Sequence, residues 1–297
     1  MPLITTDDGV KLHYEVTGAG DAILFLHEFG GHHLSWEPQV RYFSRRYRCI
    51  SYAARGWPPS DIPASADAYS QERAADDAAA VLRGLGIGQA HLVGLSMGAT
   101  AAIEFGIRHP QMALSLTAAA AGSGASTDPA AKRRFQEECA AFAARIEREG
   151  MPAMAELYCA GTARVQFRDK DPRGWAEFKR QFAEGSAIGH ARTMIGVQSR
   201  RVPLFERKAE LAAIPAPTLI IAGDEDDSTL DLALFLKRTI PCCGLMMLPK
   251  TGHTINLEEP AAFNAAVESF LHAVERGRWG ESATLAGKTY TLVPRDK

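Results

Sequence analysis

Residues 90–99, AHLVGLSMGA, place a serine at the point where an apolar run gives way to a helical pattern. The apolar run is typical of a strand buried on both faces, and the small-residue pattern of 97–109 predicts a helix packed closely on a sheet. Ser96 stands at the junction, with Gly94 and Gly98 two residues away on either side. Such a turn strains the serine backbone, needs small neighbours and projects the hydroxyl out of the sheet. We therefore predict that Ser96 is a nucleophile.

Short apolar runs recur along the chain and alternate with helical patterns. Residues 70–85 carry apolar positions at a helical period, with Ser70 as the expected N-cap. This alternation of strands and helices indicates a parallel sheet covered by helices. An N-terminal hairpin is expected over residues 3–16, around an Asp-Gly turn. The other predicted strands are 22–27, 47–54, 114–121, 218–223 and 243–249.

One segment interrupts the alternation. Residues 124–213 show helical patterns and no convincing strand, and the proline-containing stretch IPAPT (214–218) marks the return to the sheet. We predict a core formed by residues 1–123 and 214–297, with residues 124–213 inserted as an all-helical unit.

Composition and charge argue against several classes of partner. The 297 residues include 33 Lys and Arg and 35 Asp and Glu, a formal net charge of −2, which gives no argument for a nucleic-acid partner. No run approaches the roughly 18 apolar residues of a membrane span, and the N-terminus lacks an apolar signal core. The five cysteines show no zinc or redox spacing. We expect a cytoplasmic protein that acts on a small molecule, without a nucleic-acid or membrane partner. The polar tail contains a β-like stretch, TYTLV (289–293).

A serine nucleophile needs a base, and the base needs an acid that orients it. Among nine histidines, His253 is the best placed, because it lies in a glycine-containing loop just past the last predicted strand, at the edge where Ser96 is expected. The acid is expected within 224–227, directly after the preceding strand. The count from the end of that strand favours Asp226, with Asp227 next.

Five segments form a set that extends over most of the chain: LHEFGG (26–31), YAARGWPPSD (52–61), GLSMGA (94–99), PTLIIAGDEDD (217–227) and TGHTINLEEP (251–260). Together with the chain order Ser96, Asp226, His253, this set resembles the α/β-hydrolase family. The resemblance implies an eight-stranded, mostly parallel sheet flanked by helices, with a helical cap over the site. It also implies that Ser96 is the nucleophile, Asp226 the acid and His253 the base.

The resemblance further implies an oxyanion hole made by the backbone N–H groups of Met97 and Phe29. The sequence departs from the family at Glu28, where glycine is more frequent, and at Ala53, where an acid is usual. A carboxylate aimed into the hole would oppose the developing negative charge, so the Glu28 side chain should turn away from the serine.

A buried carboxylate needs a partner, and the loop after the next strand supplies Arg55. We predict that Glu28 pairs with Arg55 and joins two loops that frame the pocket. His27 is expected to hold the first of these loops by hydrogen bonds rather than to act as the base.

The predicted reaction is acyl transfer to water through an acyl-enzyme, which needs no cofactor and no metal. A partly apolar pocket lined by Phe29, Trp36 and Met97 suits a small carboxylic ester or a lactone. The alternatives are a carbon–carbon bond hydrolase for a β-diketone type of substrate, and a member of the fold that binds a small molecule or carries out cofactor-free oxygen chemistry. A serine at position 96 argues against epoxide opening and halide displacement, for which family relatives use an aspartate.

Overall fold

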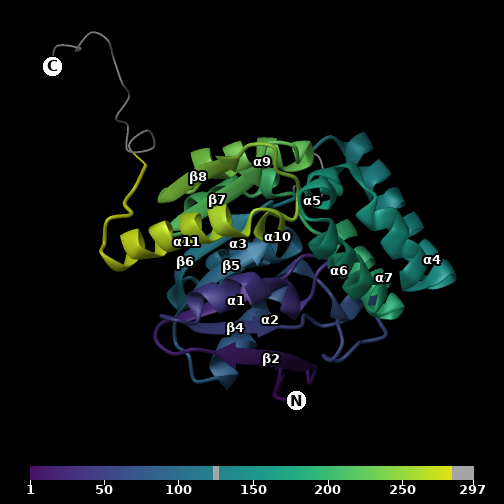
Figure 1. The fold of residues 1–297 in the computed structure, drawn as a ribbon, viewed down its shortest axis with the longest axis horizontal. Coiled ribbons are helices and arrows are strands. Elements are labelled where there is room, and N and C mark those ends of the chain that lie inside the picture. Colours follow the sequence, from purple (N-terminus) through teal and green to yellow (C-terminus); the bar gives the residue numbers. More distant parts are fainter. Residues whose placement is uncertain (123–126, 283–297) are drawn as a thin grey trace, which may run out of the picture.

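A single sheet of eight strands forms the centre of the molecule (Figure 1). The strands are β1 (Leu3–Thr5), β2 (Lys11–Thr17), β3 (Ala22–Leu26), β4 (Arg48–Tyr52), β5 (Ala90–Leu95), β6 (Ala113–Ala119), β7 (Thr218–Gly223) and β8 (Cys243–Leu248). Their order across the sheet is β1-β2-β4-β3-β5-β6-β7-β8. β2 runs antiparallel to β1 and to β4, and every other pair is parallel. This computed structural model, which describes residues 1–122 and 127–282, confirms the predicted eight-stranded, mostly parallel sheet.

The remaining elements of the described chain are helical. The helices that cover the sheet are α1 (Glu37–Phe43), α2 (Gln71–Gly84), α3 (Met97–Arg108), α8 (Lys208–Ala212), α9 (Asp227–Thr239), α10 (Ile255–Glu258) and α11 (Pro260–Glu275). Those between β6 and β7 that lie beyond the sheet are α4 (Pro129–Cys159), α5 (Val165–Lys170), α6 (Pro172–Ala183) and α7 (Ala187–Thr193), followed by a π-helix, η5 (Met194–Ser199). Short 3-10 turns are η1 (His33–Trp36), η2 (Ala66–Ala68), η3 (Pro110–Met112), η4 (Thr162–Arg164) and η6 (Leu204–Glu206).

Both faces of the central strands are covered. In β3, Ile23 and Phe25 pack with side chains of α1 and α11, whereas Leu24 and Leu26 pack with side chains of α2, α3 and α9. Successive side chains of a strand point to opposite faces, so a strand covered on both faces must be apolar at every position. This is why the central strands could be predicted from near-continuous apolar runs.

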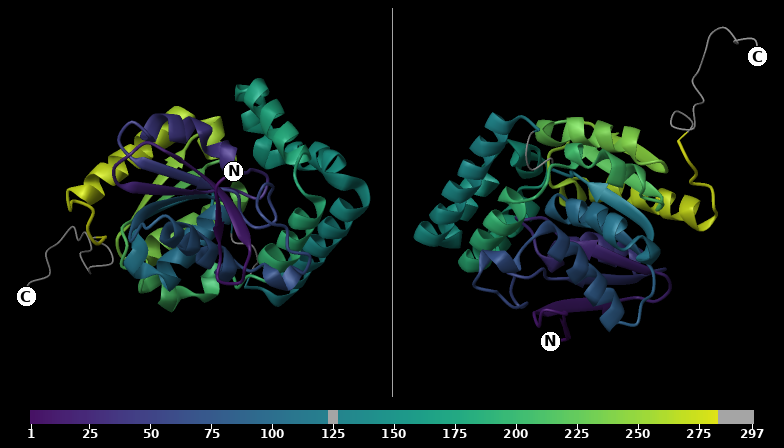
Figure 2. Two further views of the ribbon diagram at one scale, coloured as in Figure 1. Left: turned by 90° about the horizontal axis from the view of Figure 1, so that it is seen from below. Right: turned by 180° about the vertical axis from the view of Figure 1, so that it is seen from behind.

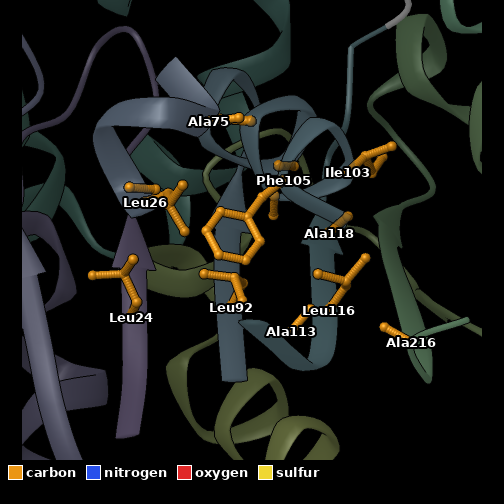
Figure 3. Packing of buried hydrophobic residues seen from close by; sticks show 14 of the residues in the cluster. Leu24, Leu26, Ala75, Leu92, Ile103, Phe105, Ala113, Leu116, Ala118 and Ala216 are labelled. Carbon is orange, nitrogen blue, oxygen red and sulfur yellow. The ribbon is translucent and has the colours of Figure 1, made fainter. Parts of the chain in front are cut away.

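Close packing of α3 on the sheet fixes the helix that follows Ser96. Figure 3 shows Phe105 of α3 above Leu92 of β5, between Leu24 of β3 and Leu116 of β6. All four side chains are fully buried, and burying a phenylalanine or leucine contributes roughly 1.5–3 kcal/mol. The helix therefore cannot shift on the sheet without a large loss of contact.

The described part of the chain between β6 and β7 consists of helices and short connections, and no strand lies among its described residues. Figure 1 and Figure 2 show α4, α6 and α7 gathered at one end of the sheet. α4 bends at Gly150, where φ is +77°, shortly before Pro152. Near the end of this segment Leu204 and Leu211 pack in the same cluster as the sheet residues. The last residues of the predicted insertion thus lie on the core.

The stretch TYTLV (289–293) lies outside the described residues. Within the described chain, none of the helices has both the length and the apolar character that a membrane span requires.

Candidate active site

Ser96 occupies a strained turn between β5 and α3. Its φ is +54° and its ψ −110°, in a region that residues with a Cβ atom rarely adopt. A Cβ atom on Gly98 would lie 2.0 Å from the carbonyl oxygen of Leu26, and one on Gly94 would lie 2.1 Å from the carbonyl oxygen of Gly98. Both glycines are therefore required by the close approach of β3, β5 and α3. The Ser96 side chain does not cap α3, which leaves its hydroxyl available for other contacts.

Asp226 and His253 meet at the carboxyl ends of β7 and β8. The Oδ2 atom of Asp226 lies 2.6 Å from Nδ1 of His253. The hydroxyls of Ser228 and Thr229 also donate to the same carboxylate, each at 3.1 Å. The two loops touch because Gly223 has no side chain, and a Cβ atom there would lie 2.2 Å from the carbonyl oxygen of Thr251.

The charge state of Asp226 follows from these contacts. Burial by itself raises the pKa of the carboxyl group, but the hydrogen bond and the charge of His253, with the two hydroxyl donors, hold that pKa below its ordinary value. The neighbouring acids have other partners: Glu225 binds Lys250 at 2.7 Å, and Asp224 accepts the backbone N–H of Thr251 at 3.3 Å. Of the acids in 224–227, Asp226 is the one that the structure joins to His253.

Ser96 and His253 leave the same edge of the sheet, because β5 and β8 point in the same direction. In the described part of the chain no hydrogen bond joins the Ser96 hydroxyl to His253. The backbone N–H of His253 donates to the carbonyl oxygen of Ala163 at 2.8 Å. The loop that carries His253 is therefore hydrogen-bonded to the turn η4 of the inserted segment. This contact was not predicted, because nothing in the sequence near Ala163 distinguishes it.

His27 joins two loops and is held neutral. Its Nδ1–H donates to the carbonyl oxygen of Glu28 at 2.8 Å, and its Nε2 accepts the backbone N–H of Ala54 at 3.0 Å. Burial lowers the pKa of the imidazole to about 3. Both ring nitrogens are occupied, so His27 is not available as a base.

The predicted pair between Glu28 and Arg55 is wrong. The Glu28 carboxylate binds Arg164 of η4, and both side chains are buried. Arg164 also donates to the hydroxyl of Tyr158 at 2.9 Å, and its guanidinium carbon lies 4.3 Å from the centre of the Tyr158 ring. The partner of Glu28 lies 136 positions further along the chain, in the inserted segment. The loop of Glu28 is therefore tied to the inserted helices.

Arg55 is committed elsewhere. It donates to both carboxylate oxygens of Asp77, at 2.6 and 2.7 Å, and to Asp8 at 2.9 Å. Asp77 lies on α2 and is buried. A forked, two-bond contact with a buried carboxylate is the geometry that arginine favours. Arg55 thus ties its loop to α2 and to the N-terminal hairpin, and it does not contact Glu28.

Replacing Arg164 with methionine should destabilise the protein by about 3–5 kcal/mol, because the Glu28 carboxylate would stay buried without a cation. Urea unfolding followed by tryptophan fluorescence measures the loss. Arg180→Met is the matched control, since the Arg180–Glu184 pair is exposed and should cost less than about 0.5 kcal/mol. The double variant Glu28→Gln/Arg164→Met should recover at least half of the loss. A loss no larger than that of the control would contradict this account of the pair.

Phe29 and Met97 lie together between the core and the inserted helices. Both belong to one apolar cluster, here called the seam cluster. Its buried members are Phe29, Ala53, Trp57, Tyr69, Met97, Ala143, Ile146, Met151, Met154, Ala155, Phe182, Ala191 and Val197. Trp36 does not lie there, contrary to the prediction that it lines the pocket. It is 1% exposed and packs between Phe25 and Phe263 on the face covered by α1 and α11.

A cavity of about 220 Å³ opens beside the seam cluster. On the core side it is lined by residues 31–34, Trp57 and Pro58. On the inserted side it is lined by Gln181, Phe182, Glu184, Gly185 and His190. Neither Ser96 nor His253 lines it.

Groups that could hold a metal ion lie away from these residues. Among the described residues, one such group is present: His13 and Glu15 of β2 and His33 of η1, whose ligand atoms lie within 4.8 Å of one another. β2 lies toward the opposite edge of the sheet from β7 and β8. The contacts of Asp226 and His253 are therefore not shared with this group.

Comparison with known proteins agrees with this architecture. The model of the alpha/beta hydrolase family matches residues 23–266. The chain is 26% identical to 3-oxoadipate enol-lactonase 1 from Acinetobacter baylyi, covering 92% of this chain and 97% of that protein. It is 30% identical to the AB hydrolase superfamily protein YisY from Bacillus subtilis, covering 91% of this chain and 98% of that one. Among solved structures, a thermophilic esterase from Thermogutta terrifontis, with malate bound, superimposes with a TM-score of 0.79 at 26% identity, covering 92% of this chain and 98% of that chain. The chain therefore belongs to the alpha/beta hydrolase family.

Proposed function

We propose that this protein is a serine hydrolase that cleaves a small carboxylic ester or a lactone. Ser96 is the nucleophile, His253 the base and Asp226 the acid that orients it. The observation that carries the proposal is the 2.6 Å contact between Asp226 and His253, at the sheet edge where the strained turn presents Ser96. This combination of a strained serine and an oriented histidine is what acyl transfer requires.

In the proposed reaction, Asp226 accepts the Nδ1–H of His253, which leaves Nε2 unprotonated and able to take the Ser96 proton. The serine oxygen attacks the substrate carbonyl, and the resulting oxyanion accepts hydrogen bonds from the backbone N–H groups of Phe29 and Met97. Collapse of this intermediate expels the alcohol, which receives the proton from His253. Water then hydrolyses the acyl-enzyme by the same steps.

The Glu28 carboxylate is compatible with this oxyanion hole. The carboxylate forms an ion pair with the guanidinium group of Arg164, which lies in η4, so its negative charge is balanced. A balanced carboxylate opposes the developing oxyanion much less than a free one would. The amide of the next residue, Phe29, can therefore act as the donor.

We also propose that the inserted helices form a cap over the reacting groups. Three contacts support this role: the apolar seam cluster, the hydrogen bond from His253 N–H to Ala163, and the ion pair between Glu28 and Arg164. A cap held in this way excludes water from one side of the pocket. Such an enclosure favours a small substrate over a polymer or a lipid aggregate.

The choice of a small ester or a lactone rests on the site together with the relatives. Two of the similar proteins are named as an enol-lactonase and an esterase. Both reactions begin with attack on an acyl carbonyl, which is the chemistry that Ser96, His253 and Asp226 would perform. The apolar seam cluster suits a short acyl chain or a small ring.

A fluorophosphonate probe followed by a substrate panel tests the proposal. We expect the probe to label Ser96, as located by mass spectrometry of the digested protein. Of a series of 4-nitrophenyl esters with two to twelve acyl carbons, and of five- and six-membered lactones, the short esters or the lactones should give the highest kcat/KM. A protein that the probe does not label, and that hydrolyses no member of the panel, would rule the proposal out.

A further inference from the structure

Two histidines and a glutamate face one another outside the proposed active site. His13 and Glu15 lie two positions apart on β2, so their side chains point to the same face of the sheet. His33, in η1, packs against His13 with the ring centres 5.0 Å apart. One ligand atom from each of the three residues lies within 4.8 Å of those from the other two. Segments that are distant in the sequence thus bring three metal-binding side chains together.

The three side chains do not satisfy one another by hydrogen bonds. Nε2 of His13 lies 3.8 Å from Oε1 of Glu15, and Nε2 of His33 lies 3.9 Å from the same oxygen. Both distances are too long for a hydrogen bond. The ligands of a tetrahedral zinc ion lie at about 2.0–2.2 Å from the metal and therefore roughly 3.3 Å from one another. The Glu15 side chain is 48% exposed, so a small rotation of it would bring the group to this spacing.

The ring of His13 is held in the orientation that a metal ligand needs. Its Nδ1 lies 3.1 Å from the carbonyl oxygen of Pro2. A carbonyl oxygen only accepts, so Nδ1 carries the proton and Nε2 of the neutral ring presents its lone pair. Metal-bound histidines are usually oriented by a bond of this kind from the other ring nitrogen. In the described chain Nε2 has no hydrogen-bond partner, so the bond to Pro2 orients a free ligand atom.

The capping of η1 distinguishes His33 from the histidine before it. Nδ1 of His32 accepts the backbone N–H of Leu34 at 3.1 Å, and the backbone N–H of His32 donates to the hydroxyl of Ser35 at 3.1 Å. His32 is thereby used as the N-cap of η1. His33 is buried instead, with Nε2 directed to the same glutamate oxygen as that of His13. The second histidine of the pair is the one available to a metal ion.

An ion can reach this group from solvent. A cavity of about 50 Å³ is lined by Glu15 and His33, among other residues. Roughly 10–15 Å³ of such space is enough for one water molecule, so the cavity has room for an ion and for a water molecule that completes its coordination. The half-exposed Glu15 forms one side of the entrance.

We propose that His13, Glu15 and His33 bind a zinc ion through two Nε2 atoms and one carboxylate oxygen. Two imidazole nitrogens and one carboxylate suit Zn²⁺, whereas Mg²⁺ and Ca²⁺ prefer sites made of oxygen ligands. Water is the fourth ligand. The ion joins η1 to β2 and stabilises the folded chain. This site is separate from the proposed catalytic groups, and the inference does not rest on the proposed function.

Calorimetric titration with zinc chloride tests the site on protein that carries no affinity tag and has been treated with EDTA. We expect one zinc ion per chain, with a dissociation constant in the micromolar range or tighter, and no comparable binding of magnesium or calcium. Cobalt(II) chloride should give the strong visible bands of a four-coordinate ion. A lack of saturable zinc binding up to millimolar concentration, or a cobalt spectrum of the hydrated ion alone, would overturn the inference.

Two variants each remove one ligand. Glu15→Gln and His33→Gln should weaken zinc binding by at least about 100-fold, since the loss of an outer-shell partner already costs about 10- to 100-fold. His272→Gln is the matched control, because His272 lies on α11 and belongs to no group of metal-binding residues in the described chain. It should keep the wild-type affinity. Zinc affinity that survives either ligand substitution would mean adventitious binding only. Glu15 is half exposed, so its variant should fold even if His33→Gln does not.

Thermal melts and probe labelling separate this inference from the proposed function. Zinc at a hundredfold excess over its dissociation constant should raise the wild-type melting temperature by roughly 4 °C, because the site exists only in the folded chain. The same addition should leave Glu15→Gln unchanged. A wild-type melting temperature that zinc does not raise would contradict the site. A protein that binds zinc in this way but resists the fluorophosphonate probe would reject the proposed function alone.

Discussion

Replacing Ser96 with alanine is expected to lower kcat on a short 4-nitrophenyl ester by on the order of a millionfold, the scale found when a serine nucleophile is removed from an intact triad. The variant keeps the turn, since alanine meets the same backbone strain at φ +54° that serine meets. It also keeps His253 and Asp226 in place. Only the attacking oxygen is lost, so the remaining rate reflects binding and the oxyanion hole.

Ser70 provides the matched control, because it also stands at the N-terminal end of a helix. Its hydroxyl accepts the backbone N–H of Arg73 at 3.0 Å and thereby caps α2. Ser70→Ala should lose about 1 kcal/mol of stability and no activity. Ser96→Ala should show the opposite, with stability retained and fluorophosphonate labelling lost. Esterase activity near the wild-type level in Ser96→Ala would mean that another residue is the nucleophile.

Changing Asp226 to asparagine should lower kcat by on the order of ten thousandfold. The asparagine amide can donate to Nδ1 of His253, whereas the carboxylate only accepts. The proton of the neutral imidazole then moves to Nε2, which can no longer take the Ser96 proton. The imidazolium formed during the reaction also loses the negative charge that balances it.

Asp227→Asn is the control for this variant, since Asp227 is exposed at the start of α9 and was the second candidate from the sequence. It should change kcat by no more than a few-fold. Steady-state kinetics with the best ester of the panel measures both variants. If Asp227→Asn shows the large loss and Asp226→Asn does not, the acid has been assigned to the wrong residue. Thermal melts of both proteins ensure that the comparison concerns folded enzyme.

The predicted elements agree with the structure because their signals are local. The strand predicted over 90–96 is β5, and the helix predicted over 70–85 is α2, with Ser70 as its N-cap. A strand covered on both faces must be apolar throughout, so its sequence carries its own signal. The helices of the inserted segment, from Pro129 onward, also carried a local signal, because their apolar residues recur at a helical period. The arrangement of these helices over the core could not be predicted. The apolar face of an amphipathic helix shows that the face is buried, but it does not show which surface it packs against.

The site shows the same division. Asp226 and His253 could be predicted to lie near each other, because each directly follows a parallel strand and the carboxyl ends of parallel strands lie at one edge of the sheet. The partner of Glu28 could not be predicted in this way. Burial indicated that Glu28 needs a cation, but its partner Arg164 lies in the inserted helical segment, and the sequence does not show where that segment packs on the core.

By itself, the sequence determined the strand–turn–helix unit of Ser96, the order of the strands along the chain and the candidates for acid and base. These features depend on residues close together in the chain or on the common direction of parallel strands. Only the tertiary structure decided which charges meet: Glu28 with Arg164, and Arg55 with Asp77. Ion pairs depend on distances between distant segments, and those distances are set when the inserted helices pack against the sheet through apolar contacts that specify no particular charge partner.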